Sequence, residues 1–259
     1  MNNEKKNILL GILGGLGPMS GVYFCEMLTS HTAASSDREH INFLLSSRAD
    51  TPDRSSFILG ASSADPSPVM VEEARRLESA GADLLAIPCN TAHYFYKSIR
   101  DAVNIPVINI IEESARFCSY EGVTKVGVLA TEGTSASGAY SEIFSSRGIS
   151  IEPMTADEQA VITRIIFDEI KSGKDPDMHS LNAVCDALGD RGCQRIILGC
   201  TELSLIKKNY RLPHYFIDSL ELLAIAAIHQ CGKSPVGFDA PLMKFYGDTE
   251  KGRTKALCF

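Results

Sequence analysis

Short apolar runs alternate along the chain with segments in which apolar residues recur every three or four positions. The runs predict buried strands, and the spaced positions predict amphipathic helices. The predicted strands are Ile8–Leu13, Ile41–Ser47, Leu84–Ile87, Pro106–Ile108, Lys125–Ala130, Ile149–Glu152, Arg195–Leu198 and Tyr215–Ile217. The predicted helices are Pro18–His31, Pro68–Ser79, Thr91–Val103, Glu112–Tyr120, Ser135–Arg147, Glu158–Lys171, Pro176–Gly189, Glu202–Lys208 and Leu220–His229. This alternation is typical of an α/β fold with parallel sheets. From about Gly232 onward, glycine, proline and charge predict an irregular extension.

The order of these segments repeats in the second part of the chain. The similar pairs are Leu10–Gly14 with Val126–Ala130, Ile87–Thr91 with Leu198–Glu202, and Pro106–Asn109 with Tyr215–Asp218. Apolar strands can resemble one another by chance, but three pairs in the same order favour an internal duplication. We therefore expect two similar parallel-sheet α/β halves with pseudo-two-fold symmetry, residues 1–114 plus 216–259 and residues 115–215. Ligands bind beyond the carboxyl ends of such strands, so the active site is expected in the cleft between the halves.

Composition and charge limit the possible partners. The 259 residues carry a net charge of −7, which disfavours nucleic acid but not a small anion held by local donors. No apolar stretch is long enough to span a bilayer. Lys5 and Lys6 precede an apolar run, but four glycines break that run, so a first strand is favoured over a secretory signal. We expect a cytoplasmic protein that does not bind membranes.

The chain has eight cysteines, which raises the question of disulfides and metals. Without a predicted signal peptide, reduced thiols are favoured over a disulfide framework. The closest pair is Cys185 and Cys193, and no C-x-x-C occurs, so no metal site is expected. Most buried cysteines are inert, and we expect this of Cys25, Cys118, Cys185, Cys193, Cys231 and Cys258.

Cys89 and Cys200 differ from the others because each stands between a predicted strand and a predicted helix. The free N–H groups of a helix N-terminus can hold a carboxylate and stabilise a thiolate. One such cysteine would suggest a nucleophile, with His93 as its base. Two matching cysteines on opposite sides of a substrate carbon can instead remove a proton from one face and deliver one to the other.

These segments resemble the aspartate/glutamate racemases, and the resemblance covers most of the chain. The motifs that carry it are Gly14–Pro18, Pro52–Arg54, Pro88–His93, Gly127–Thr131 with Gly133 and Thr134, Ile170–Gly173 and Gly199–Glu202. Glutamate racemases usually have histidine where this chain has Glu202, so the aspartate branch is the better match. Leu16 and Ser46–Arg48 depart from the family pattern and leave the side chain of the substrate open.

The resemblance implies a racemase that needs no cofactor, acts on aspartate or glutamate and forms a homodimer. It implies that Cys89 and Cys200 are the catalytic acid and base. The substrate-binding residues that it implies are Arg54, Asn90, Thr91, Thr131, Thr134, Lys171, Thr201 and Glu202. Among these, Arg54 and Lys171 would bind the distal carboxylate or stabilise the charge that develops as the α-proton leaves.

Other interpretations remain open at this point. Members of the wider group include decarboxylases and isomerases of small dicarboxylates, which often keep only one cysteine, and a binding protein could retain the cleft without turnover. The glycine turn could hold a dinucleotide, with Arg48 on a 2′-phosphate, although its spacing differs from G-x-G-x-x-G. His93 is expected to be structural, Glu202 could simply favour a helix dipole, and Arg54 and Lys171 could be surface charges.

Overall fold

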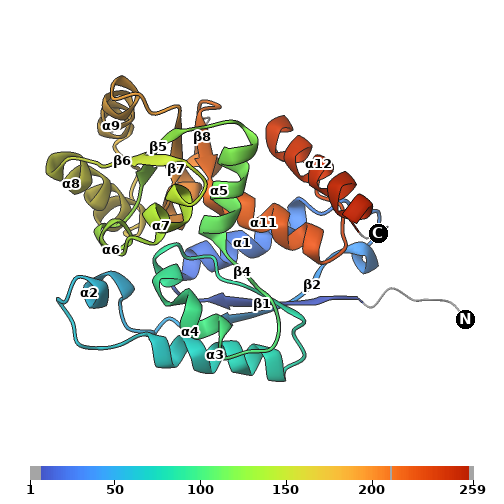
Figure 1. Cartoon of the computed structure of the whole chain (residues 1–259). Helices are drawn as coiled ribbons and strands as arrows, with labels where there is room; N and C mark the ends of the chain where they lie inside the picture. Colours follow the sequence, from blue (N-terminus) through green and yellow to red (C-terminus); the bar gives the residue numbers. More distant parts are fainter. Residues whose placement is uncertain (1–6, 211, 257–259) are drawn as a thin grey trace, which may run out of the picture.

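Two parallel sheets form the framework of the computed structural model, which describes residues 7–210 and 212–256 (Figure 1). The first has the strand order β2-β1-β3-β4 and the second β6-β5-β7-β8. The strands are β1 (Leu9–Gly14), β2 (Asn42–Ser47), β3 (Leu84–Ala86), β4 (Val107–Ile108), β5 (Lys125–Leu129), β6 (Ser150–Glu152), β7 (Arg195–Leu198) and β8 (Phe216–Asp218). The strand order of one sheet becomes that of the other when four is added to each number. This equivalence confirms the expected α/β fold with two similar halves.

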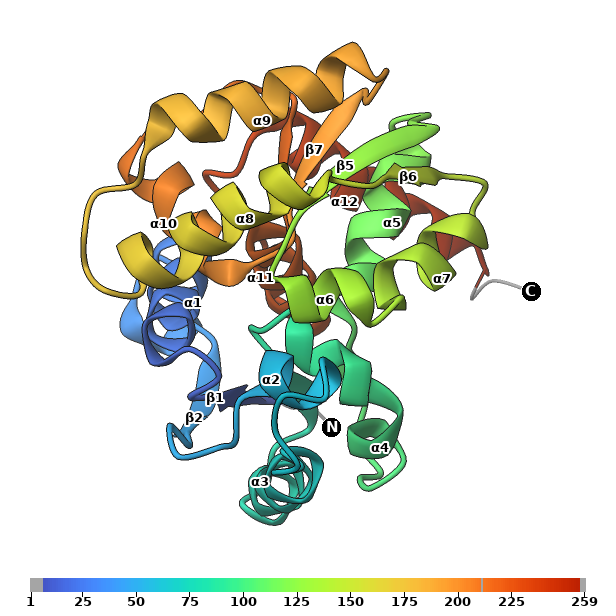
Figure 2. The same cartoon turned by 90° about the vertical axis from the view of Figure 1, so that its left-hand side faces the viewer.

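Helices join the strands and cover both sheets (Figures 1 and 2). The α-helices are α1 (Pro18–Ser30), α2 (Arg54–Ile58), α3 (Ser67–Ser79), α4 (Tyr96–Arg100), α5 (Ile110–Tyr120), α6 (Glu132–Ala136), α7 (Ala139–Ser145), α8 (Ala156–Arg164), α9 (Met178–Asp190), α10 (Thr201–Asn209), α11 (Ser219–Gln230) and α12 (Ala240–Ala256). The other helical turns are η1 (Asp37–Glu39), η2 (Thr91–Phe95) and η3 (Ile165–Ile170). No helix in this described part combines the length and apolarity needed to cross a bilayer.

Three predicted helices are subdivided in the structure. Thr91–Val103 begins as the 3₁₀ turn η2 and ends with α4 at Arg100. Ser135–Arg147 is broken by Gly138, whose positive φ of 72° places a left-handed residue between α6 and α7. Glu158–Lys171 changes from α8 to the π-helix η3. Hydrophobic spacing alone does not separate these closely related helical forms.

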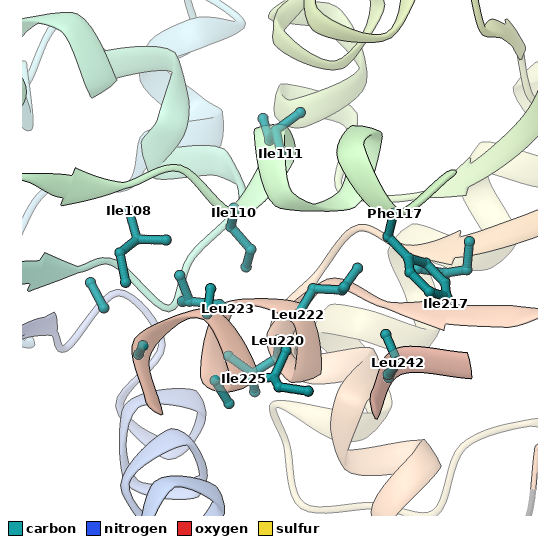
Figure 3. Close-up of a cluster of buried hydrophobic side chains, with 14 of the residues drawn as sticks. Ile108, Ile110, Ile111, Phe117, Ile217, Leu220, Leu222, Leu223, Ile225 and Leu242 are labelled. Atoms are coloured by element: carbon teal, nitrogen blue, oxygen red, sulfur yellow. The ribbon is translucent and has the colours of Figure 1, made fainter. Parts of the chain in front are cut away.

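The apolar contact between α5 and α11 connects the two halves. Each helix starts directly after the last strand of one sheet. The N-cap of α5 is Asn109, which follows β4, and the N-cap of α11 is Asp218, the last residue of β8. Figure 3 shows their side chains, including Ile110, Ile111 and Leu223, in one buried cluster. α5 follows β4 of the first sheet but packs on α7 of the second half, and α11 follows β8 of the second sheet but packs on α1 of the first half. Each helix thus crosses to the other half.

These contacts bear on the expected division of the chain. Residue 114, the expected end of the first segment, lies inside α5, and β8 pairs with β7 although 216–259 was assigned to the first half. We propose instead that the halves are divided after β4 and after β8, at residues 109 and 218.

The segment from Gly232 onward is not the irregular extension that was expected, because residues 240–256 form α12. Leu242, Phe245 and Tyr246 follow helical spacing and are buried, and α12 packs against α5 and α11. Pro241 is tolerated at the first turn of this helix. The prediction was wrong because it gave more weight to the glycines and prolines of this segment than to the helical spacing of its few apolar residues.

Candidate active site

Residues from both halves line one narrow cavity with a volume of about 10 Å³. Its walls come from the segments that follow β1, β2 and β3 in the first sheet and β5, β6 and β7 in the second, so it lies at the carboxyl ends of both sheets. Figure 2 shows α2 of the first half facing α6 of the second. The lining residues are Leu16, Asp53, Arg54, Ser55, Cys89, Asn90, Thr91, Thr131, Phe167, Lys171, Cys200, Thr201 and Glu202. The two cysteines thus reach the same space from opposite halves.

Cys89 lies in a turn that is fixed by its backbone. The Cys89 N–H donates to the carbonyl of Ile87 over 2.8 Å, and the Cys89 carbonyl lies 2.8 Å from Nδ1 of His93. The backbone N–H of Ile110 donates to Nε2 of His93 over 3.1 Å. A carbonyl only accepts and an N–H only donates, so His93 is neutral with its proton on Nδ1.

His93 is therefore suited to hold this turn and not to act as a base. Its burial lowers its pKa to about 4, against the backbone groups of Cys89 and Ile108, which favour the charged form. Both ring nitrogens are occupied by backbone groups. This arrangement supports the structural role expected for His93.

Cys200 has a different environment, because it is the N-cap of α10 and its thiol donates to Oε2 of Glu202 over 3.0 Å. Burial and then the carboxylate of Glu202 raise the pKa of the Cys200 thiol well above its usual range, although Lys171 opposes this. The thiol therefore keeps its proton at neutral pH.

Glu202 connects Cys200 to Lys171 and to the glycine turn. Its Oε1 lies 3.5 Å from Nζ of Lys171, which also stands over the ring of Phe167 at 4.5 Å. A Cβ at Gly17 would lie 2.4 Å from Oε1 of Glu202, and the φ of Gly17 is +120°. The turn thus needs glycine here because L side chains rarely adopt this φ, and the Glu202 carboxylate also occupies the neighbouring space.

The alternative dinucleotide interpretation of this turn finds little support in these contacts. A Cβ at Gly15 would lie 2.3 Å from the backbone N of Arg48, so the chain itself fills this side of the turn. The Arg48 guanidinium, which could have met a 2′-phosphate, pairs with Glu73 at 2.7 Å and with Asp50 at 3.0 Å.

Arg54 is buried and is not the surface charge that was one possibility. Its Nη2 donates to the carbonyl of Leu16 over 2.8 Å, and Nη1 donates to the carbonyls of Thr51 and Pro52. Its Nε is buried and finds no partner among the described residues. A buried guanidinium whose hydrogen bonds all go to neutral carbonyls is ready to attract an anion.

Threonine hydroxyls meet where α2 and α6 approach each other. Thr91 Oγ1 lies 2.7 Å from that of Thr134 and 3.2 Å from that of Thr131, which accepts a hydrogen bond from Ser55. A Cβ at Gly133 would lie 2.5 Å from Cα of Ser55, so this close approach requires glycine. Thr91 and Thr131 line the cavity, whereas Thr134 lies behind them and lines a separate hollow.

Asn90 and Thr201 occupy equivalent positions after the two cysteines, and both are buried and line the cavity. The structure therefore brings together every expected site residue except Thr134, which contacts the site through its hydroxyl. The sequence analysis did not predict Asp53, Ser55 or Phe167. Phe167 could have been predicted, because it stands four residues before Lys171 in a predicted helix and side chains at this spacing lie on the same helix face.

The remaining cysteines agree with an inert role. Cys118, Cys185 and Cys231 are buried, and burial raises the pKa of the Cys118 and Cys185 thiols to about 12. Cys25 and Cys193 are half-buried and also free, while Cys258 lies outside the described residues. Among the described residues, no cluster of three histidine, cysteine, aspartate or glutamate side chains could hold a metal.

Comparison with known proteins shows the family. The sequence model of the Asp/Glu/Hydantoin racemase family matches residues 13–227. The chain belongs to this family. Racemases are isomerases, so the expectation of an isomerase is confirmed, as is the resemblance that carried it.

Two relatives match almost their whole length. The broad specificity amino-acid racemase RacX of Bacillus subtilis (strain 168) is 27% identical over 233 residues, which are 85% of this chain and 96% of RacX. The structure of the Picrophilus torridus aspartate racemase has a TM-score of 0.77 and 29% identity, covering 88% of this chain and 96% of that one. A Francisella tularensis glutamate racemase in complex with D-glutamate, at a TM-score of 0.61 and 20% identity over 86% and 81%, shows the same fold.

The position of His93 predicts a pH-dependent loss of stability. Its pKa is about 4 in the folded chain and about 6.5 when unfolded, so the unfolded chain binds more protons between these values. The free energy of unfolding should therefore fall as the pH falls through this window, by roughly 2 kcal/mol at pH 5. Urea unfolding of the wild type and His93→Gln at pH 7 and pH 5 measures this, since glutamine can donate and accept without titrating.

The wild type should lose about 2 kcal/mol more than His93→Gln between the two pH values. His179→Gln, at an exposed position, is the matched control and should behave like the wild type. The same pH dependence in all three proteins would show that His93 is not held neutral by the fold.

Proposed function

We propose that this chain is a cofactor-independent racemase of an acidic amino acid, aspartate or glutamate, with Cys89 and Cys200 as acid and base at the α-carbon. The observation that carries the proposal is that two thiols from equivalent strand ends line a single cavity from opposite halves. A nucleophilic mechanism needs one thiol and a base, and the candidate base His93 is occupied by backbone groups.

In the proposed reaction, a thiolate on one side removes the α-proton and becomes a thiol. The electron pair of the C–H bond moves onto the α-carbon and is delocalised into the α-carboxylate. The opposite thiol then donates its proton to the other face of the carbon and becomes the thiolate. The product has inverted configuration, and the two sulfurs have exchanged protonation states, so the reverse reaction uses the same groups.

In this scheme Cys200 supplies the acid. Its thiol donates to Glu202, and burial and the carboxylate of Glu202 keep its pKa high. A substrate ammonium group that paired with Glu202 would weaken this hold on the proton, because the carboxylate would then be shared with a cation. Substrate binding and proton release from Cys200 would in this way be coupled.

The charges in the cavity support a substrate with two carboxylates. Arg54 offers a buried guanidinium with an unpartnered Nε, and Lys171 offers an ammonium group that now pairs with Glu202. If the substrate ammonium group takes over Glu202, Lys171 becomes available for a carboxylate. We assign the other carboxylate contacts to the polar groups beside the cysteines, which are Asn90, Thr91, Thr131 and Thr201, with Thr134 supporting the threonines from behind.

The named relatives agree with amino-acid racemisation and differ in breadth, since one is an aspartate racemase and another has broad specificity. We place this chain with the acidic substrates because of Arg54 and Lys171. Family resemblance also supports a homodimer in the cytoplasm, which we retain as part of the proposal.

Replacement of either active-site cysteine should abolish most of the activity. Cys89→Ser and Cys200→Ser should each lower racemisation of aspartate or glutamate by about 1,000-fold, because a serine hydroxyl is a much weaker acid and base. Optical rotation in the absence of any added cofactor measures this, and Cys25→Ser on α1 is the matched control. Full activity in either active-site variant would rule out the two-base scheme.

Substitution of Lys171 should distinguish acidic from neutral substrates. Lys171→Met should lower kcat/KM for aspartate by roughly 10- to 100-fold, since a charge-assisted hydrogen bond contributes roughly 1.5–3 kcal/mol. The effect on asparagine, which has the same length without the second charge, should be much smaller. Lys174→Met, at an exposed neighbouring position, is the control. Equal losses for both substrates would show that Lys171 does not bind the side-chain carboxylate.

A further inference from the structure

The side-chain amide of Asn90 lies between elements that belong to different parts of the fold. Asn90 directly follows Cys89 and is 2% exposed. Its Nδ2 donates to Oγ of Ser219 over 3.0 Å, and its Oδ1 accepts from the hydroxyl of Tyr140 over 2.7 Å. Ser219 is the first residue of α11, and Tyr140 lies on α7. The residue beside one cysteine is thus held by two helices outside its own sheet.

The chain of hydrogen bonds continues to the second cysteine. Ser219 Oγ donates to the carbonyl of Leu198 over 2.7 Å, and Leu198 stands two residues before Cys200 at the end of β7. Ser219 and Leu198 are almost fully buried. A continuous polar path therefore leads from the Cys89 turn to the Cys200 turn without passing through solvent.

The direction of each hydrogen bond in this path is determined. The Leu198 carbonyl only accepts, so the single proton of Ser219 is used there and Ser219 must accept from the Nδ2 group of Asn90. Oδ1 of Asn90 then faces Tyr140, whose pKa is raised by burial so that the hydroxyl remains a donor. Flipping the amide would break both contacts. One N–H of Asn90 is left over and can still donate to a substrate carboxylate.

Hydrogen bonds of this kind restrict geometry more than apolar packing does. They have a preferred length and direction, and in a buried site the loss of one partner leaves a polar group without compensation. Transfer of a proton to and from one carbon requires both sulfurs at a set distance, and a displacement of 1 Å can cost about 100-fold in rate.

We propose that Tyr140 and Ser219 are positioning residues that set the separation of Cys89 and Cys200 by holding Asn90 between the two cysteine-bearing turns. This inference rests on the proposed function, because the separation matters only when both thiols act on one carbon. Neither Tyr140 nor Ser219 lines the cavity, so their effect passes through Asn90 and Leu198.

Ser219→Ala and Tyr140→Phe test this in solution. Each should lower kcat for racemisation by at least about tenfold while KM changes much less, since the carboxylate contacts other than that of Asn90 remain. In heavy water, the ratio of deuterium in recovered substrate to deuterium in product should rise. Removal of the α-proton and its replacement by deuterium on the same face need one thiol, whereas inversion needs both thiols at the correct separation. Ser114→Ala is the matched control: Ser114 is also fully buried and donates to a backbone carbonyl, at 2.8 Å, but on α5.

A second measurement does not depend on turnover. Short reagents with two thiol-reactive ends and spacers of different length should link Cys89 to Cys200, and mass spectrometry of the linked peptides gives the preferred length. The wild type and Ser114→Ala should prefer one length, and the two positioning variants should accept several.

The outcomes separate the inference from the proposed function. If the wild type racemises no acidic amino acid but the variants still accept a wider range of spacer lengths, the positioning role is supported and the proposed function is wrong. If the wild type racemises and the folded variants match it in kcat, isotope ratio and linking preference, the positioning role is wrong.

Discussion

The apolar contact between α5 and α11 is the constraint on which the site depends. Each helix begins at the carboxyl end of one sheet and packs against the other half, so neither half can turn away without exposing the shared cluster of Figure 3. The carboxyl ends of both sheets consequently face the same space. Parallel strands followed by helices direct backbone N–H groups to those ends. The framework therefore places Cys89 and Cys200 around one cavity before any side chain contributes chemistry.

The framework repeats, but the residues placed on it do not. Cys89 and Cys200 are equivalent, whereas the residue two positions later is Thr91 in one half and the carboxylate Glu202 in the other. Glu202 keeps a proton on Cys200, so the two cysteines differ in a way that symmetry alone would not produce. In the proposed reaction, one thiol and one thiolate are needed at the same time. Duplication of the fold and divergence at single positions together account for both requirements.

Apolar runs and strand ends predicted the strands, the two similar halves and the positions of the two cysteines, whereas the other expected residues of the site came from the family resemblance. The failures of this prediction have physical reasons. The crossing of α5 and α11 depends on tertiary packing, which hydrophobic spacing along one segment does not record. Local spacing likewise cannot show that Asn90 is held by Tyr140, which lies 50 residues away. The burial of Arg54 also depends on a distant partner, the carbonyl of Leu16.

The most direct test of the two-thiol account is the position of the isotope after brief reaction of the wild-type enzyme with one enantiomer of aspartate or glutamate in heavy water. Mass spectrometry of the separated enantiomers at low conversion gives the deuterium at each α-carbon. The account predicts that the product carries deuterium from the first time points while the recovered substrate keeps its hydrogen, because different thiols remove and deliver the proton. Deuterium entering both enantiomers equally from the start, or product that retains the original hydrogen, would contradict it.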